Sequence, residues 1–259
     1  WWNGNLILMN KFENKTVLIT GGSRGIGKAI ALKFANQGAN IIFNYLRNHQ
    51  AALETFDQIT SLGVKCKKIK AHLGDEEKIN FLFTQIKNEF DSIDILINNA
   101  ASGVQKQSTE LEPKHWDWTM NINAKAPWLC AIKASEIMPK GSSIINITSE
   151  GSRKVLPYYF SVGTSKAALE ALTRYLAVEL SSKGINVNAV SGGFIETDAF
   201  KSFPNKQNMV KAGQNTFGSR QMTAEDLANV VTFLCSKEAE MIKGQIIIVD
   251  GGVTLTHQL

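Results

Sequence analysis

Short apolar runs alternate along this chain with longer segments of helical periodicity, and glycine or polar residues mark most of the boundaries. The first run, 17–19, ends at Thr20-Gly21-Gly22, and a helical pattern over 26–36 follows it. Continuous apolar strands that are separated by helices are typical of a parallel sheet covered on both faces. The sequence therefore predicts a single α/β domain, a Rossmann-like doubly wound parallel β-sheet with helices on both faces and its ligand at the carboxyl ends of the strands.

The same pattern gives the expected elements and the domain limits. The expected strands are 17–19, 40–43, 64–71, 93–97, 143–147, 185–190 and 245–249. The expected helices are 26–36, 50–61, 75–90, 115–133 with an interruption at Pro127, 164–181 and 224–234. We expect one domain over 9–259, preceded by an extension, 1–8, that is not part of the fold. The segment 192–223 has no clear periodicity, and so long a loop is usually functional, which predicts a substrate-binding lid.

Composition excludes several functional classes. The chain has 259 residues and no apolar run near the roughly 20 residues that a membrane-spanning helix needs. Its three cysteines and four histidines have no disulfide or metal spacing, which predicts reduced thiols, a cytoplasmic protein and no metal site. The net charge is +5, but the basic residues are dispersed. This argues against nucleic-acid binding and favours an anionic substrate or partner.

A glycine-rich loop joins the first expected strand to the first expected helix. Glycines at such a junction permit a tight turn and let the backbone approach phosphate groups, while the helix N-terminus adds its amides and its dipole. The alternative is a glycine-rich turn without a ligand. The location between strand and helix favours dinucleotide binding. The expected contacts in this loop are Gly21, Ser23, Arg24, Gly25, Ile26 and Gly27.

The end of the second expected strand indicates which nicotinamide cofactor is bound. An NAD site usually has a carboxylate there to hold the ribose 2′-hydroxyl. This strand instead runs into Leu46-Arg47-Asn48, without an acidic residue. Arg47, together with Arg24, could hold the extra 2′-phosphate of NADPH, or both arginines could simply be solvated. The missing acid and the two cations favour NADPH, bound in part by Leu46, Arg47 and Asn48.

A tyrosine and a lysine lie seven residues apart near the start of an expected helix. Tyr159 and Lys166 return to nearly the same helix face, because seven residues at about 100° each make almost two full turns. The position four residues before Lys166 is Val162, which cannot donate a proton. A nearby ammonium would lower the tyrosine pKa and ease proton donation. The alternative is an aromatic core residue beside a solvated lysine.

Together these segments resemble the short-chain dehydrogenase/reductase superfamily over about 15–252. Further matching pieces are Asn98-Asn99-Ala100-Ala101, the strand that ends in Thr148-Ser149, the segment 193–197 and the closing 249–252. Most members carry Tyr-x3-Lys, whereas this chain carries Tyr-x6-Lys. That spacing, with the strings at 98–104, 115–126 and 165–180, is similar to the FabL type of enoyl-acyl-carrier-protein reductase.

The resemblance implies a role for each matching position. Tyr159 and Lys166 would form the catalytic pair, and Ser149 and Asn123 would also be catalytic. The implied cofactor contacts are Lys166 and Asn99 at the nicotinamide ribose, His72 and Leu73 beside the adenine, and Ile195 and Thr197 at the carboxamide.

The implied reaction is the NADPH-dependent reduction of the trans-2 double bond of enoyl-acyl-carrier-protein thioesters in bacterial fatty acid elongation. Hydride would reach the β-carbon, and Tyr159 with Lys166 would stabilise the enolate. The longer spacing fits this chemistry, because three residues move the donor about 4.5 Å along a helix, away from the hydride. The alternatives are a 3-ketoacyl or other carbonyl reductase of the same superfamily and a non-catalytic NADPH-sensing protein.

The resemblance also implies two protein partners. An acidic acyl carrier protein would bring the substrate. Basic residues in or near the segment 192–223 could dock it or be merely solvated; they are Lys201, Lys206, Lys211 and Arg220, with Arg153 and Lys154 upstream. Ala167, Ala168 and Ala171 would permit close helix packing in a homotetramer.

Overall fold

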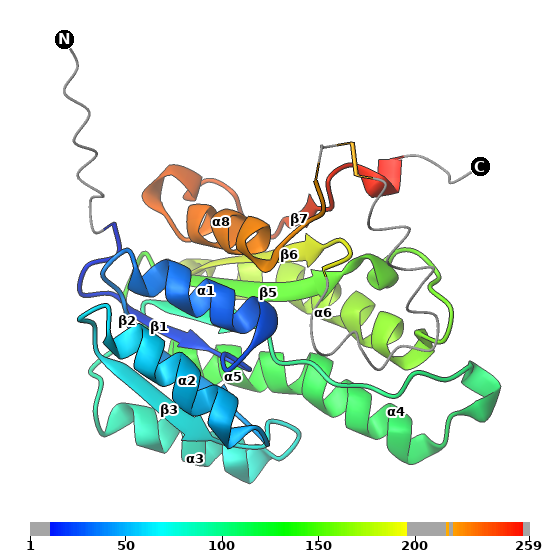
Figure 1. Ribbon diagram of the computed structural model, residues 1–259, viewed down its shortest axis with the longest axis horizontal. Coiled ribbons are helices and arrows are strands. Elements are labelled where there is room, and N and C mark those ends of the chain that lie inside the picture. Colours follow the sequence, from blue (N-terminus) through cyan, green and yellow to red (C-terminus); the bar gives the residue numbers. More distant parts are fainter. Residues whose placement is uncertain (1–10, 196–215, 218–219, 256–259) are drawn as a thin grey trace.

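The computed structural model describes residues 11–195, 216–217 and 220–255, and in these ranges it shows one parallel sheet (Figure 1). The strand order is β3-β2-β1-β4-β5-β6-β7. The strands are β1 (Thr16–Ile19), β2 (Asn40–Tyr45), β3 (Cys66–Lys70), β4 (Ile95–Asn98), β5 (Ser143–Ser149), β6 (Asn186–Gly192) and β7 (Ile246–Val249). The predicted doubly wound α/β fold is confirmed. The extension 1–8 lies outside the described residues, as does most of the predicted lid.

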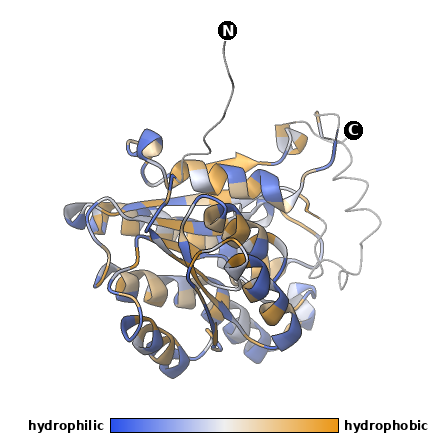
Figure 2. Cartoon of the chain, turned by 60° about the vertical axis from the view of Figure 1, so that its left-hand side comes forward, coloured by the Kyte–Doolittle hydropathy of each residue, from blue (hydrophilic) through white to orange (hydrophobic). Residues whose placement is uncertain are grey.

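Helices cover both faces of this sheet (Figure 1). One face is packed by α1 (Gly25–Ala35), α2 (His49–Thr60) and α8 (Ala224–Leu234), and the other by α3 (Glu76–Lys87), α5 (Ala126–Ser135) and α6 (Phe160–Glu179). Successive strand residues point to opposite faces, so Val17 and Ile19 join the first core and Leu18 the second. Hydrophilic and hydrophobic residues both occur along the helices that cover the sheet (Figure 2).

The strand order reverses direction between β1 and β4. The chain builds the sheet outward from β1 through β2 to β3, then returns to place β4 on the other side of β1. A reversal of this kind separates the loops that follow the two strands and opens a crevice at their carboxyl ends. The glycine-rich loop follows β1 and Asn99 follows β4, so the fold places both at this crevice.

The predicted interruption at Pro127 is wrong. Helix α4 (Pro113–Met120) continues through a π-helical segment, η2 (Asn121–Lys125), into α5 without a break. The amide of Ala126 donates to the carbonyl of Asn121, five residues back, and Pro127 falls in the first turn of α5. A proline is tolerated there because the wider turn and the helix start do not require its missing N–H.

Helix α6 begins at Phe160, four residues before the predicted start at Thr164. Tyr159 is its N-cap residue, with φ −109° and ψ 15°. Tyr158 before it has φ 60°, in the left-handed region that non-glycine residues seldom adopt. The tyrosine predicted to be catalytic therefore lies at the junction of a strained turn and a helix.

Within the described ranges, no helix has the length and apolar character needed to cross a membrane.

Candidate active site

A cavity of about 810 Å³ lies at the carboxyl ends of β1, β2, β3 and β4. It is lined by most of the residues predicted to bind the cofactor, namely Gly21, Ser23, Arg24, Gly25, Ile26, Gly27, Leu46, Arg47, Asn48, His72, Leu73 and Asn99. Ile195 instead packs against the core beneath α1 and α8, and Thr197 lies outside the described residues. The fold thus gathers segments from four different strand ends around one space large enough for a dinucleotide.

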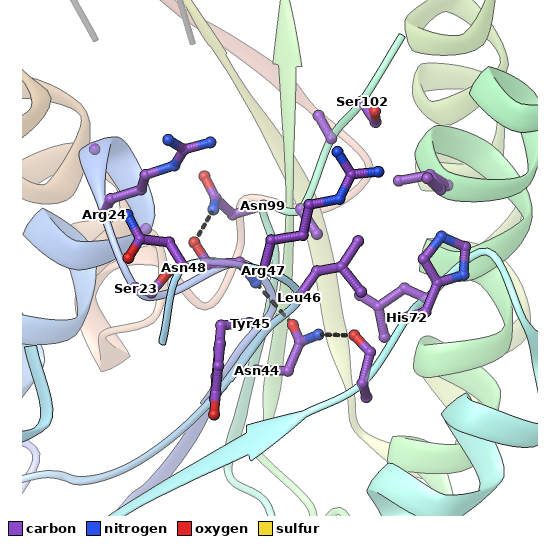
Figure 3. A pocket seen from close by; sticks show the side chains of 18 of the residues that line it. Ser23, Arg24, Asn44, Tyr45, Leu46, Arg47, Asn48, His72, Asn99 and Ser102 are labelled. Atoms are coloured by element: carbon purple, nitrogen blue, oxygen red, sulfur yellow. Dashed lines mark hydrogen bonds between the residues drawn. The ribbon is translucent and has the colours of Figure 1, made fainter. Parts of the chain in front are cut away.

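Side chains from both neighbouring strands hold the glycine-rich loop in place (Figure 3). The amide of Gly21 donates to Oδ1 of Asn44 at 2.8 Å, and Nδ2 of Asn44 donates to the carbonyl of Ala71 at 3.0 Å. From the other side, Nδ2 of Asn99 donates to the carbonyls of Thr20 and Gly21 at 3.0 and 3.1 Å. A Cβ at Gly27 would lie 2.3 Å from the Gly21 carbonyl oxygen, so only glycine permits this close approach.

Asn44 was not among the predicted site residues. It is almost fully buried near the end of β2, directly after the apolar run 41–43, and its amide connects the loops after β1 and β3. The one available signal was a polar residue in a run of buried apolar ones, since a buried amide needs hydrogen-bond partners.

Two arginines supply the charge of this cavity. Among its described lining residues the charged side chains are those of Arg24 and Arg47, and there is no carboxylate. Both guanidinium groups extend to the same side of the strand ends (Figure 3). Asn48 lies beside them, but its Oδ1 accepts from the amide of Ala51 and caps α2. The donor set fits a phosphorylated ribose and lacks the acid that an unphosphorylated ribose would need.

Aromatic rings form another wall of the cavity. His72 and Trp118 have ring centroids 5.0 Å apart, and Trp118 donates through Nε1 to Oγ of Ser102 at 2.9 Å. Nε2 of His72 is buried and has no hydrogen-bond partner among the described residues. Trp118 and Ser102 were not predicted as site residues, because α4 and the loop after β4 meet only in the folded chain. The two rings are tilted by 43° to each other, and an aromatic wall of this kind suits a ring system.

Ser149 and Tyr159 meet at the carboxyl end of β5. Their hydroxyl oxygens are 3.4 Å apart. The ring of Tyr159 lies against Gly151, where a Cβ would be 2.5 Å from its Cδ1 atom. Gly151 was not predicted, because nothing in its sequence context indicates a contact with a residue eight positions later.

Lys166, in the second turn of α6, and Asn123 are both buried. Nζ of Lys166 donates to the carbonyl of Ile147 at 2.7 Å, and the side chain is 5% exposed. Asn123, in the π-helical segment, accepts from the Ser102 amide and donates to the Ser102 carbonyl, both at 2.8 Å, and donates to Oγ of Ser165 at 3.0 Å. Asn123 therefore fixes the loop after β4 to the residue next to Lys166.

The predicted lowering of the tyrosine pKa is not what the structure shows. Burial raises the pKa of Tyr159 above its ordinary value, and the contact with Ser149 offsets this only in part. The ammonium of Lys166 itself donates to the carbonyl of Ile147. Burial also lowers the pKa of Lys166 to about 8, against the opposing charge of Glu170. At neutral pH the tyrosine is therefore a protonated donor beside a mostly charged lysine.

The position four residues before Lys166 is closed by packing. Val162 is 8% exposed, and its Cγ2 atom would be 2.3 Å from a Cβ at Gly103. Thr119 lies next to the same point. A longer side chain at position 162 has no room beside Gly103, which leaves Tyr159 as the tyrosine near the start of α6.

Several basic residues suggested for carrier-protein docking have intramolecular partners. Arg220 makes two bonds to the carboxylate of Asp226, at 2.7 and 2.6 Å, where Asp226 caps α8. Lys154 lies 3.5 Å from Glu150, and Arg153 donates to Ser191 at 3.4 Å. The remaining three, Lys201, Lys206 and Lys211, lie outside the described residues.

Comparison with known proteins places the chain among reductases. A family model described as enoyl-(acyl carrier protein) reductase matches residues 21–254. A 1-cyclohexenylcarbonyl-CoA reductase of Streptomyces collinus is 34% identical over 92% of this chain and 86% of its own length. The 3-oxoacyl-[acyl-carrier-protein] reductase FabG of Staphylococcus aureus is 34% identical over 92% of this chain and 98% of its own.

Solved structures give the same result. A short-chain dehydrogenase from Burkholderia cenocepacia, in complex with NADP, superposes with a TM-score of 0.88 and 28% identity over 94% of this chain and 99% of its own. The angucycline ketoreductase LanV with bound NADP has a TM-score of 0.87 and 32% identity, over 95% and 98% of the two chains.

These matches confirm the broader expectation and leave the narrower one open. The relatives include 3-oxoacyl reductases, so the FabL-type assignment stays a prediction, and ketoacyl reduction has at least as much support from them. The breadth of the match, in sequence and in structure, means that the chain belongs to the short-chain dehydrogenase/reductase superfamily and is an NAD(P)-dependent oxidoreductase.

Proposed function

We propose that this protein is an NADPH-dependent reductase of acyl thioesters that acts on the trans-2 double bond of enoyl chains carried by acyl carrier protein. The observation that carries the choice of bond is the position of the proton donor. Tyr159 is the N-cap residue of α6 and precedes Lys166 by seven residues. The buried Val162 occupies the position four residues before Lys166.

Each active-site residue has a defined task in this reaction. When bound, NADPH supplies a hydride to the β-carbon of the substrate. Negative charge then collects on the thioester carbonyl oxygen, where the protonated hydroxyl of Tyr159 donates a hydrogen bond. A proton from solvent reaches the α-carbon and completes the reduction. Ser149 orients that hydroxyl, and the charge of Lys166 stabilises the developing anion.

NADPH is the cofactor that the cavity fits. Arg24 and Arg47 face the same side of it, and its described lining has no carboxylate. The NADP complexes of related structures support this choice. Lys166 and Asn99 would hold the nicotinamide ribose, and the wall of His72 and Leu73 would lie against the adenine.

Reduction of a 3-ketoacyl thioester is the second candidate. Its support is the presence of 3-oxoacyl-[acyl-carrier-protein] reductases among the relatives at 33–34% identity. In that reaction the hydride reaches the carbonyl carbon itself, so the donor must lie closer to the nicotinamide than in enoyl reduction. The two candidates therefore differ in where Tyr159 stands relative to the cofactor.

The deciding experiment measures NADPH oxidation by absorbance with a trans-2-enoyl thioester and, separately, with a 3-ketoacyl thioester. Each is repeated with NADH and with Tyr159→Phe. Tyr175→Phe, an exposed residue on α6, is the matched control. Oxidation of NADPH by the enoyl substrate, lost in Tyr159→Phe and kept in Tyr175→Phe, is expected. Turnover of the ketoacyl substrate alone would establish the second candidate.

The assembly remains part of the proposal. We infer a homotetramer that receives substrate from an acidic acyl carrier protein. Ala167 and Ala168 lie at or near the surface of α6, and further along the helix Tyr175 and Val178 are 70% and 75% exposed. Close helix packing across such a face would bury apolar surface that the single chain leaves in water.

A further inference from the structure

Glu170 is a buried carboxylate one helical turn after Lys166. It is 6% exposed, and carboxylates are seldom so buried without strong partners. Its Oε1 accepts from Oγ1 of Thr148 at 3.0 Å and from Oγ of Ser152 at 2.5 Å. Glu170 thereby ties α6 to the end of β5 and to the short helix η3 (Glu150–Ser152).

The two hydroxyls that Glu170 binds enclose the segment that places Tyr159. Between Thr148 and Ser152 lie Ser149, whose hydroxyl is 3.4 Å from that of Tyr159, and Gly151, against which the Tyr159 ring rests. Ser152 also lies 2.8 Å from the Ser149 carbonyl oxygen. A shift of this segment would move the hydroxyl of Tyr159 and its partner together.

Glu170 also acts on Lys166 by charge. Residues four apart lie on one face of a helix, and the carboxylate opposes the lowering of the Lys166 pKa that burial causes. The elements packed against α6 in the described structure bring other charged groups nearby, but these have outward partners or are exposed. They are Glu150 with Lys154, Arg153 with Ser191, Lys125 with Glu76, Lys114 and His115 with Glu112, Lys183 with Ser135, and the exposed Asp117; Tyr159 precedes the helix.

We propose that Glu170 is a positioning residue of the active site, which fixes the segment 149–152 beneath Tyr159 and places a negative charge one helical turn from Lys166. The inference rests on the proposed roles of Tyr159 and Lys166. The Glu170 carboxylate would have two effects: its hydrogen bonds position the segment 149–152, and its charge acts on Lys166. Substitutions can separate these effects, because only the second requires the negative charge.

The first test is the pH dependence of kcat/KM in Glu170→Gln. Glutamine keeps the size and one acceptor oxygen but removes the charge. Lys166 is charged below its pKa, so activity that needs the ammonium is lost as pH rises through about 8 in the native protein. Without the carboxylate this loss should move roughly one pH unit lower, which leaves about a tenth of the native activity above pH 8. Glu179→Gln, an exposed glutamate on the same helix, should leave the profile unchanged.

The second test separates position from charge. Ser152→Ala removes a bond to Glu170 but keeps the carboxylate, so kcat should fall about tenfold while the alkaline limb stays in place. Native kcat in this variant would overturn the positional half of the proposal. This variant also carries the test if Glu170→Gln does not fold, as judged by circular dichroism.

A readout without substrate keeps this inference distinct from the proposed reaction. Acetic anhydride labels neutral amines, so the extent of Lys166 acetylation, followed by mass spectrometry against pH, reports its charge. Labelling at lower pH in Glu170→Gln than in the native protein is expected. Identical labelling curves would overturn the link between Glu170 and Lys166 even in an active enzyme. Failure of the native protein to reduce any thioester would instead refute the proposed function.

Discussion

Replacing Gly151 by alanine tests whether Tyr159 is placed by the surface on which its ring rests. A Cβ at this position would lie 2.5 and 2.6 Å from Cδ1 and Cε1 of Tyr159, and 3.3 Å from Cδ1 of Leu156. Carbon atoms in contact prefer separations of about 3.5–4.0 Å. The ring must therefore move by about 1 Å, or the segment 149–152 must move away from it.

Either movement disturbs the contact with Ser149. The two hydroxyls are already 3.4 Å apart, near the limit of a hydrogen bond, so a change of about 1 Å breaks or redirects it. A displacement of this size at a reacting group costs on the order of 100-fold in rate. Stability should fall by only about 1–3 kcal/mol, the usual cost of overpacking.

The assay compares kcat for NADPH oxidation in Gly151→Ala and in Gly63→Ala. Gly63 has φ 81°, and no atom lies within 4 Å of the place that a Cβ would take, so alanine there strains the backbone without touching the site. Its cost of about 1 kcal/mol makes it a control for general destabilisation. Native kcat in Gly63→Ala with a fall of about 100-fold in Gly151→Ala is expected. If Gly151→Ala keeps kcat within about threefold, the ring contact does not place the donor.

Three further predictions address the cofactor, the loop and the assembly. Arg24→Ala and Arg47→Ala should each raise KM for NADPH about tenfold to a hundredfold, because a charge-assisted bond contributes about 1.5–3 kcal/mol, and should leave KM for NADH nearly unchanged; equal effects on both would exclude a 2′-phosphate contact. Asn44→Leu leaves the Gly21 amide and the Ala71 carbonyl unpaired, so the free energy of unfolding measured in urea should fall by roughly 2–5 kcal/mol. An unchanged denaturation midpoint would show that the glycine-rich loop does not depend on Asn44. Val178→Glu puts a charge on the exposed α6 face and should yield a smaller species by light scattering with unchanged circular dichroism; an unaltered mass would place the interface elsewhere.

The sequence was sufficient for the elements and for the cavity because both depend on local patterns. Strand and helix periodicity predicted the order of the elements, and the position of the glycine-rich loop after β1 predicted most of the cavity lining. The interruption at Pro127 was wrong because a π-helical turn absorbs the proline, and no local rule signals such a turn. Periodicity placed the start of α6 at Thr164, whereas Pro157 indicated that Tyr159 lies in or just before the first turn, and the structure places Tyr159 there as the N-cap.

The residues that were missed share another property. Asn44, Gly151 and Trp118 each act through a contact with a different segment of the chain, across a strand end, a turn or the cavity. Their side chains carry no chemistry that would mark them out in isolation. Such roles become visible only when the packing partner is known, because a hydrogen bond or a close approach is a property of two positions.

The position of Tyr159 shows why spacing alone does not fix the reaction. Seven residues make nearly two turns only within a regular helix, but Tyr159 lies at the N-cap, outside helical geometry. Its ring rests on Gly151, its backbone pairs with Lys106 after β4, and Val162 closes the alternative place against Gly103. The donor is therefore placed by the loops around α6. If those loops determine its distance from the hydride, relatives with the usual spacing and this chain can share a lysine, a cofactor site and a fold, and still reduce different bonds of a thioester.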